Sequence, residues 1–207
     1  MGISASRSYE TVAPISMPYQ EKSCPGRHAL NRKETMRTML YWIEGPWTRR
    51  LAISPRPRGG DWLEEEIRAW RQAGIDIVVS LLTPEEVTEL DLGTEAAWCQ
   101  AYGLQFFSFP IVDRGVPVSR RASVELVRKL DKLLTEGKSI AVHCRQGIGR
   151  SALLAACLLI VSGEDQETAF QRISAARSYP VPETAEQREW VRAIAAELLA
   201  PLPRKSP

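Results

Sequence analysis

The chain has 207 residues, of which 44% are hydrophobic and 25% charged, and its formal net charge is +2. This composition is that of an ordinary folded domain, which excludes fibrous and wholly disordered proteins. The net charge is too small to indicate a nucleic-acid partner, and no run of basic residues is interleaved with aromatic ones.

The four cysteines, Cys24, Cys99, Cys144 and Cys157, form no C-x-x-C pair and accompany no histidine cluster. We therefore expect no metal site. The sequence also lacks an uncharged apolar stretch of about eighteen residues and a hydrophobic signal core at its start. These absences predict a cytoplasmic protein without an integral membrane segment.

Residues 1–38 carry six Lys or Arg against three Asp or Glu and show no hydrophobic periodicity. We expect a flexible N-terminal leader without a packed core, followed by one domain over residues 39–200 and a short tail over 201–207. Met36 and Met39 stand just before the first strand-like residues, so a downstream start site is an alternative explanation of the leader.

Two short strands are predicted around a turn, over residues 41–47 and 51–53. Asp61 is a good N-cap for a helix that ends before Gly74, with Trp62, Leu63, Ile67 and Trp70 at helical spacing. We expect both tryptophans of that helix to lie in the core.

The apolar, β-branched stretch over residues 75–82 is typical of a strand buried on both faces. Thr83 and Glu86 then form a capping-box pattern around Pro84, and a short helix stops at Gly103. A strand over residues 105–109 leads into a loop with one carboxylate, Asp113, which could also be an ordinary turn residue. Ser119 caps the following helix.

The most informative stretch follows the strand-forming run over residues 138–142 and reads His143-Cys144-Arg145-Gln146-Gly147-Ile148-Gly149-Arg150-Ser151. A strong helix former, residues 152–160, comes next. The two glycines let successive backbone N–H groups point inward, and the positive end of the helix dipole faces the same spot. This loop is therefore expected to bind an anion.

The side chains of this loop predict nucleophilic chemistry. The positive field favours the thiolate of Cys144, and Arg150 can offer two parallel donors to a phosphoryl group. Ser151 is placed to donate a hydroxyl to the sulfur. We expect His143 to support the loop through hydrogen bonds to the backbone, because the residue before the nucleophile points away from the pocket.

The pattern H-C-x-x-G-x-x-R-S resembles the phosphate loop of the cysteine-dependent protein tyrosine phosphatase superfamily, and the form C-R-Q-G-I-G-R-S is most similar to its dual-specificity branch. The segment F-P-I-x-D-x-x-x-P resembles the acid loop of that branch, which implies that Asp113 is the general acid. The stretch over residues 181–188 resembles the late helix start of Cdc14-like and related phosphatases, where a polar side chain approaches the pocket. This resemblance implies that Gln187 helps to orient the hydrolytic water. A capping box from Thr184 to Gln187 explains the same residues equally well.

Strands alternate with helices around an apolar central strand, which predicts an α/β fold with a central, mostly parallel sheet flanked by helices. The resemblance implies a protein tyrosine phosphatase-like fold and a phosphatase that forms a cysteinyl phosphate without a cofactor or metal. Phosphate would be held by the loop residues Arg145, Gln146, Gly147, Ile148 and Gly149.

Arg145 is the one cation in the variable part of the loop, which favours a phosphoprotein substrate. The resemblance to the dual-specificity branch implies phosphotyrosine and also phosphoserine or phosphothreonine. Alternatives with the same chemistry are a phosphoinositide or another small phosphomonoester. A non-catalytic phosphoprotein-binding module and a rhodanese-type sulfur-transfer enzyme are alternatives of other classes.

Overall fold

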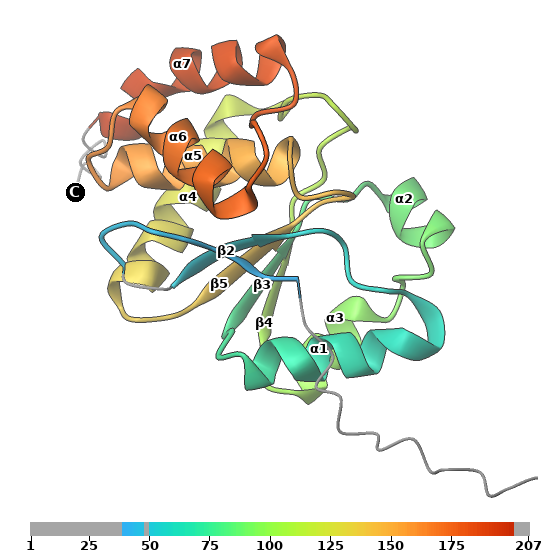
Figure 1. Cartoon of the computed structure of the whole chain (residues 1–207). Helices are drawn as coiled ribbons and strands as arrows, with labels where there is room; N and C mark the ends of the chain where they lie inside the picture. The colour runs from blue at the N-terminus through green and yellow to red at the C-terminus, as the bar shows by residue number, and fades with distance from the viewer. Residues whose placement is uncertain (1–38, 48–49, 201–207) are drawn as a thin grey trace, which may run out of the picture. The chain divides into compact units, whose positions relative to one another are not determined.

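The computed structural model describes residues 39–47 and 50–200 (Figure 1). The chain divides into two units, Met1–Thr35 and Met36–Pro207, and all described residues belong to the second. The predicted leader and tail lie outside the described residues.

The described residues form one five-stranded sheet in the order β1-β2-β5-β3-β4. The strands are β1 (Tyr41–Ile43), β2 (Leu51–Ser54), β3 (Ile77–Ser80), β4 (Gln105–Ser108) and β5 (Ile140–His143). β1 pairs with β2 in the antiparallel direction and every other pair is parallel. The predicted α/β fold with a mostly parallel sheet is thus confirmed.

Seven α-helices and one short 3-10 helix surround the sheet in the described part of the chain. They are η1 (Gly60–Trp62), α1 (Leu63–Gln72), α2 (Pro84–Glu89), α3 (Glu95–Ala101), α4 (Arg120–Thr135), α5 (Arg150–Val161), α6 (Gln166–Arg177) and α7 (Ala185–Leu199). Helices α4 to α7 cover one face of the sheet, and α1 and α3 cover the other (Figure 1).

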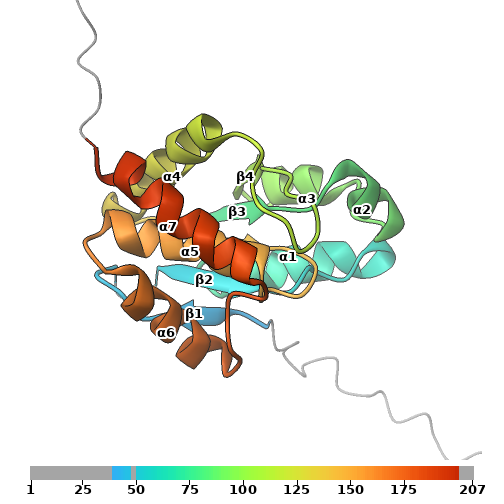
Figure 2. The ribbon, with the colours of Figure 1, turned by 90° about the horizontal axis from the view of Figure 1, so that it is seen from above.

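Alternation along the central strands divides the core between these two faces. Ile140 and Val142 of β5 pack in the cluster beneath α4 to α7, whereas Ala141 packs in the cluster with α1 and α3. Helix α5 is buried on all sides, with α4 and α6 beside it and α7 crossing over it (Figure 2). Because β5 and α5 are both central, the loop that joins them is held by the most buried elements of the domain.

The helix caps agree with the sequence in three places and disagree in one. Thr83 and Glu86 form a complete capping box at α2, and Ser119 and Thr184 cap α4 and α7. The prediction for Asp61 was wrong, because this residue lies inside η1 and α1 starts later without a side-chain cap.

The two tryptophans of this region also differ from each other. Trp70 is buried as expected, but Trp62 is 53% exposed. The expectation of a core position for Trp62 was wrong because η1 turns its ring outward, where the Arg58 guanidinium lies 4.6 Å from the ring centroid. Across the described ranges, the helices are all too short or too polar to cross a membrane.

Candidate active site

The phosphate-loop sequence lies at the carboxyl end of the central strand, as open α/β sheets place their sites. Cys144 follows β5 directly, is 3% exposed, and accepts a 3.2 Å hydrogen bond at Sγ from the N–H of Gly147. Gly147 has a φ of +70°, a conformation that glycine adopts without cost. The loop therefore curls back over the sulfur, with the amide of Gly147 turned toward it.

The two other described cysteines, Cys99 and Cys157, lie in the hydrophobic core. Burial raises the pKa of Cys99 to about 12, with a further contribution from the charge of Glu95. Burial also raises the pKa of Cys157 to about 12. Both remain neutral thiols at physiological pH and cannot serve as thiolate nucleophiles.

Arg150 lies at the start of α5, is 1% exposed, and is held by a carboxylate that the sequence did not assign to the site. Its Nη1 and Nη2 donate to the two oxygens of Glu86 at 2.6 and 2.9 Å. Nη1 also donates to the carbonyl of Ile111 at 2.9 Å. This two-pronged contact sets the plane and direction of the guanidinium before any substrate binds.

The electrostatics of this pair keep both groups ionised. Burial would raise the pKa of Glu86, but hydrogen bonds from Arg150 and from the Thr83 amide outweigh burial and lower it. Burial would lower the pKa of Arg150, but the hydrogen bonds to Glu86 and the charges of Cys144, Glu86 and Asp113 raise it. Glu86 is 8% exposed, so this is a largely buried ion pair.

Asp113, the predicted general acid, reaches the same pocket from the loop between β4 and α4. Its Oδ1 accepts a 2.7 Å hydrogen bond from Nη2 of Arg150, and its side chain is 52% exposed. Asp113 lines a cavity of about 30 Å³ together with Cys144 and Arg150. The structure thus brings the three main predicted residues together.

The variable residues of the loop are fixed from outside the pocket. Arg145 is paired with Glu89 of α2, so its charge is partly neutralised. The carbonyl of Gln146 accepts a 3.2 Å hydrogen bond from Arg177 of α6, whose guanidinium lies 4.0 Å from the ring centroid of Tyr41. This contact ties the loop to α6.

Two supporting residues lie differently from the prediction or lack a contact. The imidazole of His143 is fully buried with its Nε2 2.9 Å from Oε1 of Glu95, rather than bonded to backbone. The expected backbone contact of His143 was therefore wrong, because α3 places a carboxylate against its ring. The hydroxyl of Ser151 is buried and has no hydrogen-bond partner among the described residues, so its donation to sulfur stays a prediction.

Gln187 joins the two loops of the site from α7. Its Nε2 donates to the carbonyl of Gly115 in the acid loop at 3.1 Å, and a Cβ added to Gly149 would lie 3.0 Å from the same nitrogen. Thr184 accepts from the Gln187 amide, as an N-cap does, but the Gln187 side chain is used elsewhere. Oε1 of Gln187 is buried without a hydrogen-bond partner in the described part of the protein.

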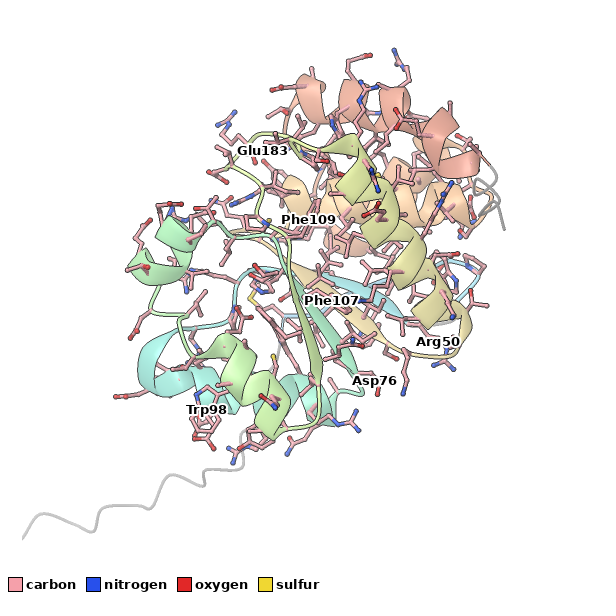
Figure 3. The ribbon with its side chains drawn as sticks, turned by 180° about the vertical axis from the view of Figure 1, so that it is seen from behind. Arg50, Asp76, Trp98, Phe107, Phe109 and Glu183 are labelled. Atoms are coloured by element: carbon pink, nitrogen blue, oxygen red, sulfur yellow. The ribbon has the colours of Figure 1, made fainter. Side chains whose placement is uncertain are left out.

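A second carboxylate, Glu183, also lines the cavity, and the sequence did not single it out. Its Oε2 would lie 2.9 Å from a Cβ at Gly149, which is the N-cap residue of α5. Figure 3 shows Glu183 beside the loop that follows β4, where Arg114 of that loop lies 3.8 Å from its carboxylate. Glu183 lies in the stretch over residues 181–188, in which the resemblance pointed to Gln187 alone. The sequence could not show that Glu183 lies close to the pocket.

The residues of the site do not form a metal centre. Within residues 39–47 and 50–200, no three His, Cys, Asp or Glu side chains are grouped so that they could hold a metal ion. The cavity is lined by residues of the phosphate loop, including Arg150, and by the carboxylates Asp113 and Glu183.

Comparisons with known proteins agree with this geometry. A family model described as "Polymorphic toxin system, DSP-PTPase phosphatase" matches residues 54–164, which include the acid loop and the phosphate loop. Cyclin-dependent kinase inhibitor 3 of Rattus norvegicus is 29% identical over 98 residues, covering 47% of this chain and 46% of the rat protein. The chain thus matches about half of the length of this relative.

Two solved structures share the fold. A kinase associated phosphatase with its catalytic-site cysteine replaced by serine superimposes with a TM-score of 0.71 at 20% identity, covering 80% of this chain and 98% of that one. Tk-PTP in its active form gives a TM-score of 0.61 at 27% identity, covering 79% of this chain and 98% of that one. The first likeness concerns the fold alone.

Proposed function

Since this chain belongs to the DSP-PTPase phosphatase family, we propose that it hydrolyses phosphate esters on proteins through a cysteinyl-phosphate intermediate. The proposed substrates are phosphotyrosine and also phosphoserine or phosphothreonine. The observation that carries this proposal is the meeting of Cys144, Arg150 and Asp113 in one cavity at the carboxyl end of β5.

In the proposed first step, the sulfur of Cys144 attacks phosphorus and the ester oxygen leaves on the opposite side. The loop amides and Arg150 hold the three equatorial oxygens, and Asp113 gives its proton to the leaving oxygen. The charge that develops is met by fixed donors, so the step requires no metal ion.

In the second step, water attacks the cysteinyl phosphate, Asp113 takes a proton from that water, and the sulfur leaves as thiolate. The position of Gln187 between Gly115 and Gly149 supports a role in orienting this water. Its buried Oε1 has no hydrogen-bond partner among the described residues and can therefore accept a hydrogen bond from water. The buried hydroxyl of Ser151 follows Arg150 and is proposed to stabilise the leaving thiolate.

The proposal for protein substrates rests on the charge and exposure of the pocket. Arg145 is paired with Glu89, so the variable part of the loop offers little excess positive charge for a polyphosphorylated lipid headgroup. Asp113 is half-exposed at the rim, which favours a shallow site that also admits phosphoserine and phosphothreonine.

The test is hydrolysis of p-nitrophenyl phosphate, a phosphotyrosine peptide and a phosphothreonine peptide without added metal. We expect the native chain to release phosphate from all three and Cys144→Ser to release none. Asp113→Ala should lower the rate on the peptides by about 10²-fold or more. A folded native chain that hydrolyses none of the three would overturn the proposal and favour a binding module instead.

A further inference from the structure

Glu183 introduces a negative charge where a phosphate must enter, and the proposed mechanism gives that charge no part. Its side chain lines the cavity and is 27% exposed. Its nearest cation is Arg114, with Nε 3.8 Å from Oε1 of Glu183, which exceeds hydrogen-bond distance. The Arg114 side chain is 67% exposed, so this contact is easily exchanged for another cation.

The charges around the cavity show why this matters. The side chains that line it include two cations, Arg145 and Arg150, and two carboxylates, Asp113 and Glu183. Both arginines have a further carboxylate partner outside the lining, Glu89 for Arg145 and Glu86 for Arg150. The charged side chains therefore give the mouth no positive excess, and the amides of the loop must supply most of the attraction for one phosphate.

We propose that Glu183 is a specificity-determining residue that selects phosphopeptides with a basic residue next to the phosphorylated one and rejects polyanionic phosphomonoesters. This inference rests on the proposed function. An Arg or Lys beside the phosphorylated residue replaces Arg114 at the Glu183 carboxylate while the phosphate occupies the loop. A second phosphate or an acidic neighbour is repelled at the same place.

The position of Glu183 makes this selection sensitive to geometry. Its carboxylate lies against Gly149, the residue that separates the loop from α5, so it is close to the bound phosphate but belongs to a different segment. Helix α7 and its cap at Thr184 fix the residues that follow. The backbone just after Glu183 is therefore fixed, and its carboxylate belongs to the lining of the cavity.

The experiment compares phosphotyrosine peptides that carry Arg, Gln or Glu directly before or directly after the phosphotyrosine. For the native chain we expect kcat/KM to be about fivefold higher with Arg than with Glu at low salt. The preference should shrink at high salt, because an exposed charge pair is screened. A short-chain phosphatidylinositol phosphate should be a poorer substrate than the Arg peptide.

Glu183→Gln keeps the size of the side chain and removes its charge, and we expect it to abolish the preference for Arg over Glu. The matched control is Glu186→Gln, an exposed glutamate in the first turn of α7, which should retain the full preference. Glu183→Lys should reverse the preference.

Two results would overturn the inference while leaving the proposed function intact. They are equal kcat/KM of the native chain for the three peptides and an unchanged preference in Glu183→Gln. If the native chain hydrolysed nothing, the proposed function would fail, and the inference would be decided separately by the Kd of the Cys144→Ser chain for the same peptides. The inference would be supported if the Cys144→Ser chain bound the Arg peptide more tightly than the Glu peptide and the double variant Cys144→Ser/Glu183→Gln did not. Equal Kd values of the Cys144→Ser chain for the two peptides would reject it.

Discussion

Nη2 of Arg150 donates a 2.7 Å hydrogen bond to Oδ1 of Asp113. The residue proposed to bind the phosphate and the proposed general acid are therefore hydrogen-bonded to each other. Both groups must change partners in the proposed reaction: Arg150 to bind a phosphoryl oxygen and Asp113 to reach the leaving oxygen. The contacts of Arg150 to Glu86 can persist throughout, because each terminal nitrogen carries two hydrogens and Nη2 uses separate ones for Glu86 and Asp113. The substrate phosphate therefore competes with Asp113 for Nη2 of Arg150, while Glu86 keeps the guanidinium aligned for the phosphate.

Asp113→Asn removes the proton donor while keeping the shape of the side chain. We expect the rate on a phosphotyrosine peptide to fall by about 10²-fold to 10⁴-fold, because tyrosine phenolate is a strong base that needs protonation as it leaves. The loss on p-nitrophenyl phosphate should be much smaller, since its leaving group is a weaker base. Equal losses on both substrates would argue against proton donation by Asp113. Glu189→Gln, a surface carboxylate paired with Arg192, serves as the control.

The same variant should bind phosphate more tightly. Removing the charge of Asp113 weakens its hold on Nη2 of Arg150 and removes a negative charge from the cavity. We expect inorganic phosphate to inhibit Asp113→Asn at a concentration several-fold lower than it inhibits the native chain. An unchanged inhibition constant would show that the Asp113 contact does not compete with phosphate.

Glu86→Gln should destabilise the protein by about 2 kcal/mol near neutral pH, because a largely buried guanidinium loses its charged partner. The pKa of Glu86 is lowered on folding, so its contribution is complete above the unfolded pKa of about 4.3 and is lost as the pH falls through the folded value.

The gap in stability between native and Glu86→Gln chains is thus expected to be widest above about pH 5 and to close on further acidification. Urea denaturation at a series of pH values measures it. Glu65→Gln, at an exposed position of α1, is the control, and a gap that stayed constant to low pH would contradict the assignment.

Gly147→Ala should damage the phosphate loop. The residue has a φ of +70°, and a Cβ there would lie 2.6 Å from the backbone carbonyl oxygen of Ser54. We expect a loss of stability of about 2 kcal/mol or more, together with a large loss of activity. Gly93→Ala is the matched control, because its φ is not positive and no atom lies within 4 Å of the added Cβ. Thermal unfolding of both variants separates the effect of the strained position 147 from the general effect of replacing glycine by alanine.

Gln187→Ala tests the two explanations of this residue. If Gln187 orients water, the second step slows more than the first, and rapid mixing should reveal a burst of product as the cysteinyl phosphate accumulates. Thr184→Ala is the control, since it removes the α7 cap at a cost of about 1 kcal/mol without touching the Gln187 side chain. A burst in both variants, or in neither, would favour a purely structural role.

Residues 143–151 could be interpreted from the sequence because their geometry is local. A loop with two glycines between a strand and a helix turns its own amides inward, whatever the rest of the chain does. The alternation of strands and helices likewise predicted a mostly parallel sheet, and every pair except β1 with β2 is parallel. Asp113 was placed near the pocket by the resemblance of its segment to the acid loop, although β3 separates β4, the strand before it, from β5.

The contacts that hold these residues in place join segments far apart in the chain, and no local pattern reports them. Glu86 and Arg150 are 64 positions apart, and Gln187 and Gly115 are 72 apart. The capping box at Thr83 already accounted for Glu86, although a carboxylate has enough acceptor sites to bind Arg150 as well. Glu183 acquires its meaning in the same way, because packing of the α7 start against Gly149 is what brings its charge to the phosphate pocket.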